Sequence, residues 1–334
     1  MNYIFGPVNS RRLGRSLGID LFPKKICNLD CVYCEVGPTA ATVNRRAAYS
    51  PATAVMAEVA DWCRQPELLD TVDVLTVTAK GEPTLHSDIG IILRYIKDTA
   101  RKPVVVLTNG TTLNDETVRC DLMAADIVVP SLDAARPESF ARVDRPAAGV
   151  DVWKVIEGLT LFSHAFSGLI WLEILLVRGM NDSPEDLDAL TAALRMMRLD
   201  RIQLNTVVRP PADPAAHPLQ AEELSACASR LGAELNLPVD VSFADQDVTN
   251  RRLSDDKVSV SPVSLSVALE EIQEIVQRRP CTAADIDRLF RLGGPGKVEQ
   301  LLMPLVQAGI LHIKVHEGTR YYTGPADRDC QEHV

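Results

Sequence analysis

The sequence lacks a hydrophobic run long enough to cross a membrane. Its longest nearly apolar run, residues 169–177, contains Glu173 and reaches about half of the ~20 residues that a membrane-spanning helix requires. The N-terminus also lacks the apolar stretch of a secretory signal peptide. We therefore expect a soluble, cytoplasmic protein with no membrane partner.

An excess of positive charge is missing as well. The 334 residues include 35 Lys and Arg against 45 Asp and Glu, and the net charge of -10 gives the whole chain no electrostatic signature of a nucleic-acid binder. Hydrophobic residues make up 46% and charged residues 24%, near globular averages, which excludes a disordered, collagen-like or low-complexity chain. The length suggests two domains.

Residues 1–243 carry the pattern of an α/β domain. Short runs rich in β-branched residues alternate with helix-period segments, which predicts βα units around a parallel sheet. Ser50 and Ser183, each followed by proline, predict capped helices over 52–64 and 185–197, and Asn114-Asp115 opens another. A helix over 221–235 and a strand near 239–243 follow. The six expected strands before them are residues 17–22, 72–78, 104–108, 127–132, 169–177 and 202–207.

A second domain follows a polar linker. Residues 244–262 hold four aspartates and are interpreted as the linker, and residues 325–334 as a tail. Between them, helices over 265–278, 283–292 (capped by Thr282) and 297–308 precede two strands, 310–315 and 319–323, with a hairpin turn at His316-Glu317-Gly318. Three helices and a two-stranded wing predict a winged helix-turn-helix domain over 263–324.

The charge of this second domain argues against DNA as a partner. Residues 262–324 contain seven basic and seven acidic residues, so the net charge of this segment is zero. Binding to a duplex draws on several uncompensated phosphate contacts. We expect instead a module that docks a peptide or protein, or a lid on the first domain.

Three of the eight cysteines form a compact triplet. Cys27, Cys31 and Cys34 have the spacing C-x3-C-x2-C just after the first expected strand, which favours metal or redox chemistry over disulfides. A structural zinc site needs four ligands, and no other Cys or His precedes Trp62, so the fourth would come from far along the chain. Alternatively, three thiolates can hold three irons of a [4Fe-4S] cluster and leave one iron open.

The triplet resembles that of the radical S-adenosylmethionine (radical SAM) superfamily. The resemblance implies a partial (β/α)6 TIM-like barrel and a [4Fe-4S] cluster whose fourth iron is chelated by the amino and carboxylate groups of S-adenosylmethionine. It places the aromatic ring of Tyr33 next to the adenine. Gly81 and Glu82 follow the second expected strand, where the family has a glycine-rich turn ending in Glu. There glycine lets the backbone approach a ligand, and the carboxylate can accept hydrogen bonds from an ammonium group.

Polar residues follow several further strands, and in a parallel barrel these strand ends meet at one mouth. An ordinary capping or turn role is the alternative for each of them. The expected cofactor-binding residues here are Asn109, Ser131 and Asp133, the last two at the position that often contacts the ribose in the superfamily. Cations near strand ends can hold a carboxylate or phosphate of a substrate. The expected substrate-binding residues are Lys80, Arg145, Glu173, Asn205 and Arg209.

A closer resemblance is to the wyosine-synthetase-like Fe-S oxidoreductase branch, over about residues 6–211. Wyosine enzymes have an additional cysteine-held cluster or a flavin domain before the triplet, whereas no cysteine precedes Cys27, so wyosine synthesis itself is not expected. The motifs that carry the resemblance are Gly6 to Gly18, Gly81 to His86, Leu107 to Gly110, Asp144-Arg145-Pro146 and Gly179 to Asp182.

The resemblance implies an enzyme that cleaves S-adenosylmethionine reductively. The 5'-deoxyadenosyl radical would abstract hydrogen from an unidentified substrate: a peptide or protein, an RNA, or a small metabolite. Flavodoxin or ferredoxin would supply the electron. The alternative is a non-enzymatic Fe-S or zinc-dependent DNA-binding regulator that acts through the winged helix, but the neutral second domain and the Gly81-Glu82 turn count against it.

Overall fold

The computed structural model describes residues 3–10, 13–241 and 265–324. The chain divides into two compact units, residues 1–243 and 244–334, which are treated separately below. The expected linker, 244–262, and tail, 325–334, lie outside the described residues. Within the described ranges no helix is both long and apolar enough to span a membrane.

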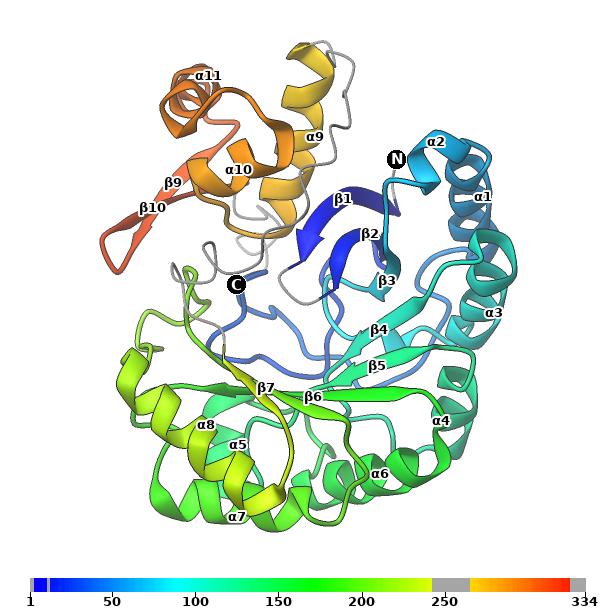
Figure 1. The fold of residues 1–334 in the computed structure, drawn as a ribbon, viewed down its shortest axis with the longest axis vertical. Helices are drawn as coiled ribbons and strands as arrows, with labels where there is room; N and C mark the ends of the chain where they lie inside the picture. Colours follow the sequence, from blue (N-terminus) through cyan, green and yellow to red (C-terminus); the bar gives the residue numbers. More distant parts are fainter. Residues whose placement is uncertain (1–2, 11–12, 242–264, 325–334) are drawn as a thin grey trace. The chain divides into compact units, whose positions relative to one another are not determined.

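An eight-stranded sheet forms the centre of the first unit (Figure 1). Its strands lie in chain order; β1 and β2 are antiparallel, and each later pair is parallel. The predicted α/β class is thus confirmed, although the sequence reasoning missed β1. The strands are β1 Ile4–Ser10, β2 Gly14–Asp20, β3 Val74–Thr78, β4 Val104–Thr108, β5 Ile127–Pro130, β6 Leu169–Leu176, β7 Arg201–Thr206 and β8 Val239–Val241.

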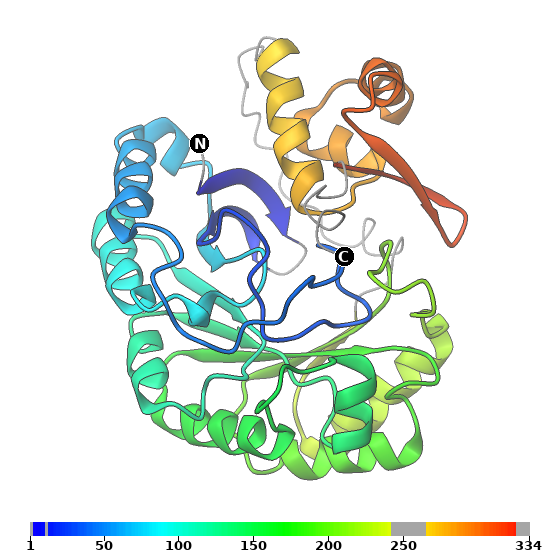
Figure 2. The ribbon, with the colours of Figure 1, turned by 180° about the vertical axis from the view of Figure 1, so that it is seen from behind.

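Helices of this unit line the outer face of the sheet, as Figures 1 and 2 show for α1, α3, α4, α6, α7 and α8. The outer face of the strands must be apolar to pack against these helices, and β4, with the sequence VVVLT, is apolar on its inner face as well. The helices are α1 Ala52–Cys63, α2 Pro66–Leu69, α3 Ile89–Ala100, α4 Glu116–Leu122, α5 Pro137–Val143, α6 Val152–Ala165, α7 Pro184–Leu194 and α8 Ala221–Leu235, with a 3-10 turn η1 at Pro83–Leu85.

The expected helix caps are confirmed in part. Ser183 caps α7 by accepting a hydrogen bond from the backbone of Asp186 at 3.2 Å, and Asp115 caps α4. The prediction for Ser50 was wrong, because Pro51 occupies the N-cap position of α1. The Ser50 hydroxyl instead donates to the carbonyl of Leu21 at 2.8 Å, a tertiary contact that local sequence does not reveal.

The second unit contains three helices followed by a two-stranded antiparallel sheet. The elements are α9 Leu265–Arg278, α10 Ala283–Phe290, α11 Pro295–Gln307, β9 His312–His316 and β10 Thr319–Thr323. Thr282 caps α10 in a reciprocal capping box, as predicted. His316 pairs with Thr319, so the hairpin turn has two residues instead of the three expected. Those residues, Glu317 and Gly318, have φ of 46° and 75°.

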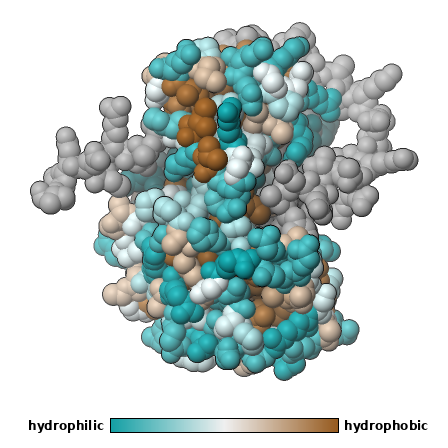
Figure 3. Space-filling view, turned by 90° about the vertical axis from the view of Figure 1, so that its left-hand side faces the viewer, coloured by the Kyte–Doolittle hydropathy of each residue, from teal (hydrophilic) through white to brown (hydrophobic). Residues whose placement is uncertain are grey.

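Apolar side chains are exposed on the second unit. Val315 is 67% exposed, and Figure 3 shows a strip of hydrophobic residues on one face of the molecule. Among residues 265–324, the other exposed large apolar residues are Met303, Ile310 and Ile313.

Candidate active site

The three cysteines lie on one long connection, residues 21–51 between β2 and α1, here called the cysteine loop. All three are free thiols; Cys27 is buried, and Cys31 and Cys34 are half-buried. Because β2 runs parallel to β3 and the strands after it, the loop leaves the sheet at the carboxyl end of these strands, where the other predicted site residues lie in or after β3 to β7. The sheet therefore brings the triplet and these residues to the same edge.

Backbone hydrogen bonds tie the cysteine loop to residues 143–147, which comprise the last residue of α5 and the four residues after it. Val32 donates to the carbonyl of Val143 at 2.9 Å, and Asp30 donates to that of Asp144 at 3.0 Å. Ala147 completes the contact by donating to Asn28 at 2.9 Å. The loop that carries the cysteines is thus held in place between Cys27 and Cys34 by a segment more than 100 residues away.

Polar groups surround the three sulfur atoms. Lys25 Nζ lies 3.2 Å from Cys34 Sγ, the backbone amide of Leu29 lies 3.5 Å from Cys27 Sγ, and Cys31 Sγ lies 3.5 Å from Asp144 Oδ1. Burial raises the pKa of Cys27 to about 12 and that of Cys31 well above its ordinary value. Buried thiols of this kind ionise when a metal takes up the charge.

Gly81 packs directly against the cysteine loop. Its φ is +130°, and it forms a parallel bridge with Ile26. The adjacent backbone groups pair as well: Ile26 donates to Lys80 at 2.8 Å, and Glu82 donates to Ile26 at 2.9 Å. Gly81 therefore permits a close approach between two segments of the protein itself. Lys80, an expected substrate-binding residue, contacts the cysteine loop here through its backbone carbonyl.

The carboxylate of Glu82 is almost fully buried, with 1% of the residue exposed. Its Oε1 accepts from the amide and hydroxyl of Thr84 at 2.9 and 2.5 Å and from the hydroxyl of Thr108 at 2.7 Å, and its Oε2 accepts from the amide of Asn109 at 2.5 Å. Burial raises the pKa of Glu82, and these hydrogen bonds oppose the rise. Glu82 thus joins the loops after β3 and β4.

Asn109 connects this turn to the cysteines. Its side-chain amide donates to Asn28 Oδ1 at 2.9 Å and lies 3.8 Å from Cys27 Sγ. Three residues predicted from separate stretches of sequence, Cys27, Glu82 and Asn109, therefore meet in one cluster.

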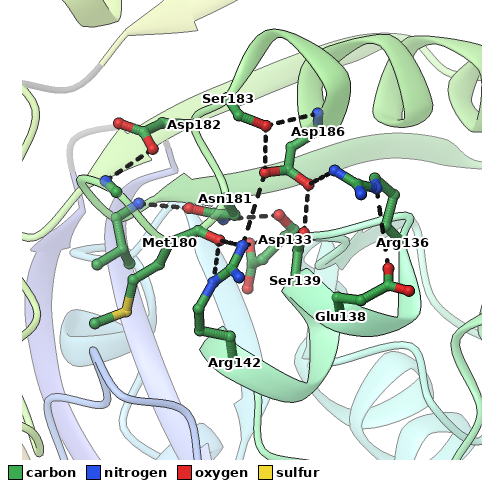
Figure 4. A network of polar contacts seen from close by, with 12 residues as sticks. Asp133, Arg136, Glu138, Ser139, Arg142, Met180, Asn181, Asp182, Ser183 and Asp186 are labelled. Atoms are coloured by element: carbon green, nitrogen blue, oxygen red, sulfur yellow. Dashed lines mark hydrogen bonds and ion pairs between the residues drawn. The ribbon is translucent and has the colours of Figure 1, made fainter.

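Tyr33 and Asp133 form a second contact across the mouth of the sheet. The Tyr33 hydroxyl donates to Asp133 Oδ2, and the amide of Leu175 donates to Asp133 Oδ1 at 2.7 Å. Asn181, which is fully buried, donates to the carbonyl oxygens of Asp133 and Leu175, both at 2.8 Å (Figure 4). Burial raises the pKa of Asp133 to about 6, and the hydrogen bonds from Tyr33 and Leu175 oppose the rise.

A small pocket, partly open to solvent, lies between these groups. Apolar side chains such as Phe140 form part of its wall, and the polar lining residues are Tyr33, Asn109, Ser131, Asp133 and Asp144. Asp144 is 2% exposed, and its carboxyl group pairs with that of Asp133. Burial, followed by the charge of Asp133, raises the pKa of Asp144 well above its usual value. A pocket that combines apolar walls with converging polar groups is the usual form of a small-molecule site.

The expected substrate-binding residues are held by partners within the protein. Asn205 Nδ2 donates to Glu173 Oε1 at 2.6 Å, which joins β6 and β7. Arg209 forms an ion pair with Glu35 at 3.0 Å, and Arg145 forms one with Asp213. Both pairs link the segment after β7 to the region of the cysteine loop. The two arginines thus have a structural partner that the sequence did not indicate.

Two site residues were missed by the sequence reasoning. Asp144 stands in the motif Asp144-Arg145-Pro146, and Asn181 in the motif Gly179 to Asp182; both motifs were noted, but neither residue was assigned a role. Membership in these motifs is the signal by which the sequence could have pointed to the two residues. Their roles depend on burial and on contacts with Cys31 and Asp133, which lie far away in the chain.

The donor set suits a cluster with one thiolate per iron. Three sulfur atoms come from one loop, with Lys25 beside Cys34 and the Asn109 amide near Cys27. In a [4Fe-4S] cluster each thiolate binds a different iron, so the thiolates need to surround the cluster without meeting at one point. Among the described residues, no three His, Cys, Asp or Glu side chains are arranged as the ligands of a single metal ion.

Comparison with known sequences gives matches over most of the chain. Residues 22–190 match the model of the Radical SAM superfamily. A Helicobacter pylori relative named UPF0026 protein is 33% identical over 301 residues, which cover 90% of this chain and 91% of the relative. A Brachyspira hyodysenteriae relative named GTPase Obg is 32% identical over 96% of this chain, but this chain spans only 45% of that relative's length.

Solved structures share the fold at low sequence identity. A radical SAM methyltransferase from Sphaerobacter thermophilus has a TM-score of 0.53 and 18% identity over 70% of this chain and 67% of that chain. Streptococcus suis SuiB bound to S-adenosylmethionine has a TM-score of 0.50 and 16% identity over 68% of this chain and 51% of that chain. At these identities the likeness shows a common fold.

Proposed function

We propose a specific chemistry for this chain, which belongs to the Radical SAM superfamily and to the UPF0026 family and is an enzyme. It binds one [4Fe-4S] cluster and S-adenosylmethionine, and it cleaves S-adenosylmethionine reductively. The observation that carries the proposal is the placement of three thiols on one loop, which packs on the Gly81-Glu82 turn and borders the cavity.

Cys27, Cys31 and Cys34 would hold three irons and leave the fourth for the cofactor. When bound, the reduced cluster would supply the one electron needed for reductive cleavage of the sulfonium C–S bond, and the cofactor would supply the hydrogen-abstracting group. The ammonium of Lys25, which lies beside Cys34, would offset part of the negative charge of a thiolate-bound cluster. The protein contributes binding, orientation and exclusion of solvent.

The cavity residues would bind S-adenosylmethionine. Tyr33 presents an aromatic face, and Ser131 and Asp133 present oxygen atoms that suit ribose hydroxyls. Gly81 and Glu82 would have different roles in the turn. Gly81 would bring Glu82 next to the cysteine loop, and Glu82 would hold the Asn109 amide near Cys27. Oε2 of Glu82 accepts a hydrogen bond from the amide of Asn109 and would accept a second from the amino group of the cofactor.

The substrate is proposed as a peptide or protein, an RNA or a small metabolite that enters at the carboxyl ends of the strands. Glu173 and Asn205 would contact it from β6 and β7, and Lys80, Arg145 and Arg209 from the neighbouring loops. An anionic substrate group would compete with Asp213 and Glu35 for the two arginines. The electron would come from a protein such as flavodoxin or ferredoxin in the cytoplasm.

The second unit is proposed as a winged helix that docks a peptide or protein. Its support is the order of three helices and a hairpin, together with the exposed apolar residues Ile313 and Val315 on β9. The motifs over residues 6–211 support a place near the wyosine-synthetase-like branch, with a substrate other than that of the wyosine enzymes.

The test is anaerobic reconstitution followed by reduction with dithionite. The wild-type protein should bind about four irons per chain and release 5'-deoxyadenosine and methionine, and Cys31→Ala should lose both properties. Cys120→Ala, which removes an exposed thiol on α4, is the matched control and should behave as the wild type. A wild-type protein that loads iron but makes no 5'-deoxyadenosine would contradict the proposal.

A further inference from the structure

Three side chains beside Cys27 form a closed ring of hydrogen bonds, here called the polar triad. Asn109 Nδ2 donates to Asn28 Oδ1 at 2.9 Å, Asn28 Nδ2 donates to Thr111 Oγ1 at 2.7 Å, and Thr111 Oγ1 donates to Asn109 Oδ1 at 2.7 Å. Asn28 is fully buried, and Thr111 is 7% exposed. The polar triad therefore joins the cysteine loop to the loop after β4 in a place that is shielded from water.

One backbone amide fixes the direction of every hydrogen bond in the polar triad. The amide of Thr111 donates to Asn109 Oδ1 at 3.1 Å, and a backbone N–H can only donate. The atom of Asn109 that faces this amide must be its oxygen, so its nitrogen faces Asn28. Asn28 then presents its oxygen to Asn109 and its nitrogen to Thr111, and the single hydroxyl hydrogen of Thr111 is left for Asn109. The protein thus determines the orientation of both side-chain amides.

This orientation points a hydrogen-bond donor at Cys27. Asn109 Nδ2 carries two hydrogens: Asn28 accepts one, and Cys27 Sγ lies 3.8 Å away as an acceptor for the other. The backbone amide of Leu29 lies 3.5 Å from the same sulfur. Cys27 Sγ thus has one donor that the backbone of the cysteine loop supplies and one donor that the polar triad holds in place.

A donor that points at a cluster ligand changes how easily the cluster takes up an electron. Reduction adds a negative charge that spreads over the irons and their sulfur ligands, and an N–H group directed at a sulfur stabilises this charge. Hydrogen bonds to the sulfurs are among the factors that set the reduction potential of an iron-sulfur cluster. The described side-chain contacts of Thr111 are with Asn28 and Asn109, so any effect of its hydroxyl on the cluster would pass through Asn109.

We propose that Thr111 is a positioning residue for the cluster: together with Asn28 it holds the Asn109 N–H donor on Cys27 Sγ, and this donor favours the reduced cluster. The inference rests on the proposed function, because it requires Cys27 to bind an iron. It goes beyond that function by giving a part in electron uptake to Thr111 and Asn28, which lie outside the cysteine triplet and outside the pocket lining.

The test measures the ratio of reduced to oxidised cluster at a fixed solution potential. Anaerobically reconstituted protein, without S-adenosylmethionine or substrate, is poised with dithionite and redox mediators, and the reduced cluster is counted by its electron paramagnetic resonance signal. Dithionite supplies one electron to each cluster, and no covalent bond forms or breaks in this step. A tenfold change in the ratio therefore corresponds to a shift of about 59 mV in the reduction potential. The measurement needs no turnover.

Two variants should lower the ratio, and a third should restore it. Asn109→Leu removes the donor and should lower the ratio by about tenfold, since a hydrogen bond to a charged group contributes on that scale. The backbone amide of residue 109, which binds Glu82, remains. Thr111→Val leaves the side-chain amide of Asn28 without its acceptor and should lower the ratio by about threefold or more. Thr111→Ser, which keeps a hydroxyl, should stay within about twofold of the wild type.

A double variant tests whether Thr111 acts through Asn109. In the Asn109→Leu background, Thr111→Val should change the ratio by less than about twofold, because the donor that it positions is gone. Thr191→Val is the matched control. Thr191 is 1% exposed and donates to the carbonyl of Leu187 at 2.8 Å within α7, so this change removes a buried hydroxyl away from the cysteines and should leave the ratio unchanged. Thermal melting and iron content establish that each variant is folded and loaded.

Three results would overturn the inference while the proposed function stands. A loaded Thr111→Val or Asn109→Leu protein with the wild-type ratio shows that the polar triad does not affect electron uptake. An effect of Thr111→Val that persists in the Asn109→Leu background shows that Thr111 does not act through Asn109. A folded Thr111→Val protein that loses iron assigns the hydroxyl to holding the cysteine loop. A wild-type protein that binds no cluster overturns the proposed function as well.

Discussion

A Cβ atom on Gly81 would stand 1.8 Å from the carbonyl oxygen of Ile26. This distance places the turn after β3 in direct backbone contact with the cysteine loop, one residue before Cys27. The neighbouring residue Glu82 then reaches the loop after β4 through Asn109. Four predictions follow from contacts of this kind.

Gly81→Ala should lower the free energy of unfolding by about 2–4 kcal/mol, because it adds a backbone clash to the strain of φ +130°. Iron content after reconstitution should fall with it, since the clash displaces the loop that bears Cys27. Urea unfolding and iron analysis measure the two effects. Gly179→Ala is the control: its φ is +69° with open space around the Cβ, so it should cost only about 1 kcal/mol. Equal losses in the two variants would contradict the close contact.

Asn181→Ala should destabilise the first unit by roughly 2–4 kcal/mol. The change leaves the buried carbonyls of Asp133 and Leu175 and the buried amide of Val177 without the side-chain partner that they have in the wild type. Chemical denaturation measures the loss. Asp182→Ala in the same loop removes one exposed hydrogen bond, to Gly179, and should cost less than about 1 kcal/mol. An Asn181 variant as stable as the Asp182 variant would show that the buried amide is dispensable.

Asp186 should make stability depend on acid pH. Burial alone would raise its pKa, but hydrogen bonds from Ser139 and Ser183 and the charges of Arg136 and Arg142 bring the pKa below the ordinary value of 3.8 (Figure 4). The lowered pKa means that the ionised form favours folding. Its contribution is full above the unfolded value and is lost as the pH falls through the lower folded value.

The matching measurement compares the wild type with Asp186→Asn across pH. Above pH 4 the variant should be less stable by roughly 1–3 kcal/mol, as expected for hydrogen bonds to a charged group. The difference in unfolding free energy between the wild type and the variant should shrink as the pH falls below 4. A difference that stays constant from pH 6 to pH 2.5 would mean that the charge of Asp186 has no part in it.

Arg145 combines an ion pair with an unfavourable backbone. Its φ is 46°, a region that glycine adopts at little cost, and its guanidinium pairs with Asp213 while the side chain is 45% exposed. Arg145→Gly should be about 1 kcal/mol more stable than Arg145→Ala, because both lose the exposed ion pair and only glycine relieves the backbone. Thermal melting of both variants gives the comparison, and an Ala variant at least as stable as the Gly variant would refute it.

Local sequence determined much of the architecture. Strand β4 lies at residues 104–108, as its β-branched run predicts, and α8 and α9 occupy the expected ranges 221–235 and 265–278. Periodicity and caps such as Thr282 act over a few residues, so one sequence reveals them. The spacing of the cysteines pointed to metal or redox chemistry for the same reason, and the resemblance then indicated the superfamily.

Tertiary structure alone decided which of those residues meet. Ser50 was expected to cap a helix and instead contacts Leu21, and Arg209 pairs with Glu35 across 174 positions. Asp144 contacts Cys31, 113 positions earlier, where α5 ends beside the cysteine loop. Such contacts depend on how parallel strands bring distant loops to one edge of the sheet, and no short sequence pattern encodes the partner of a side chain that lies a hundred residues away.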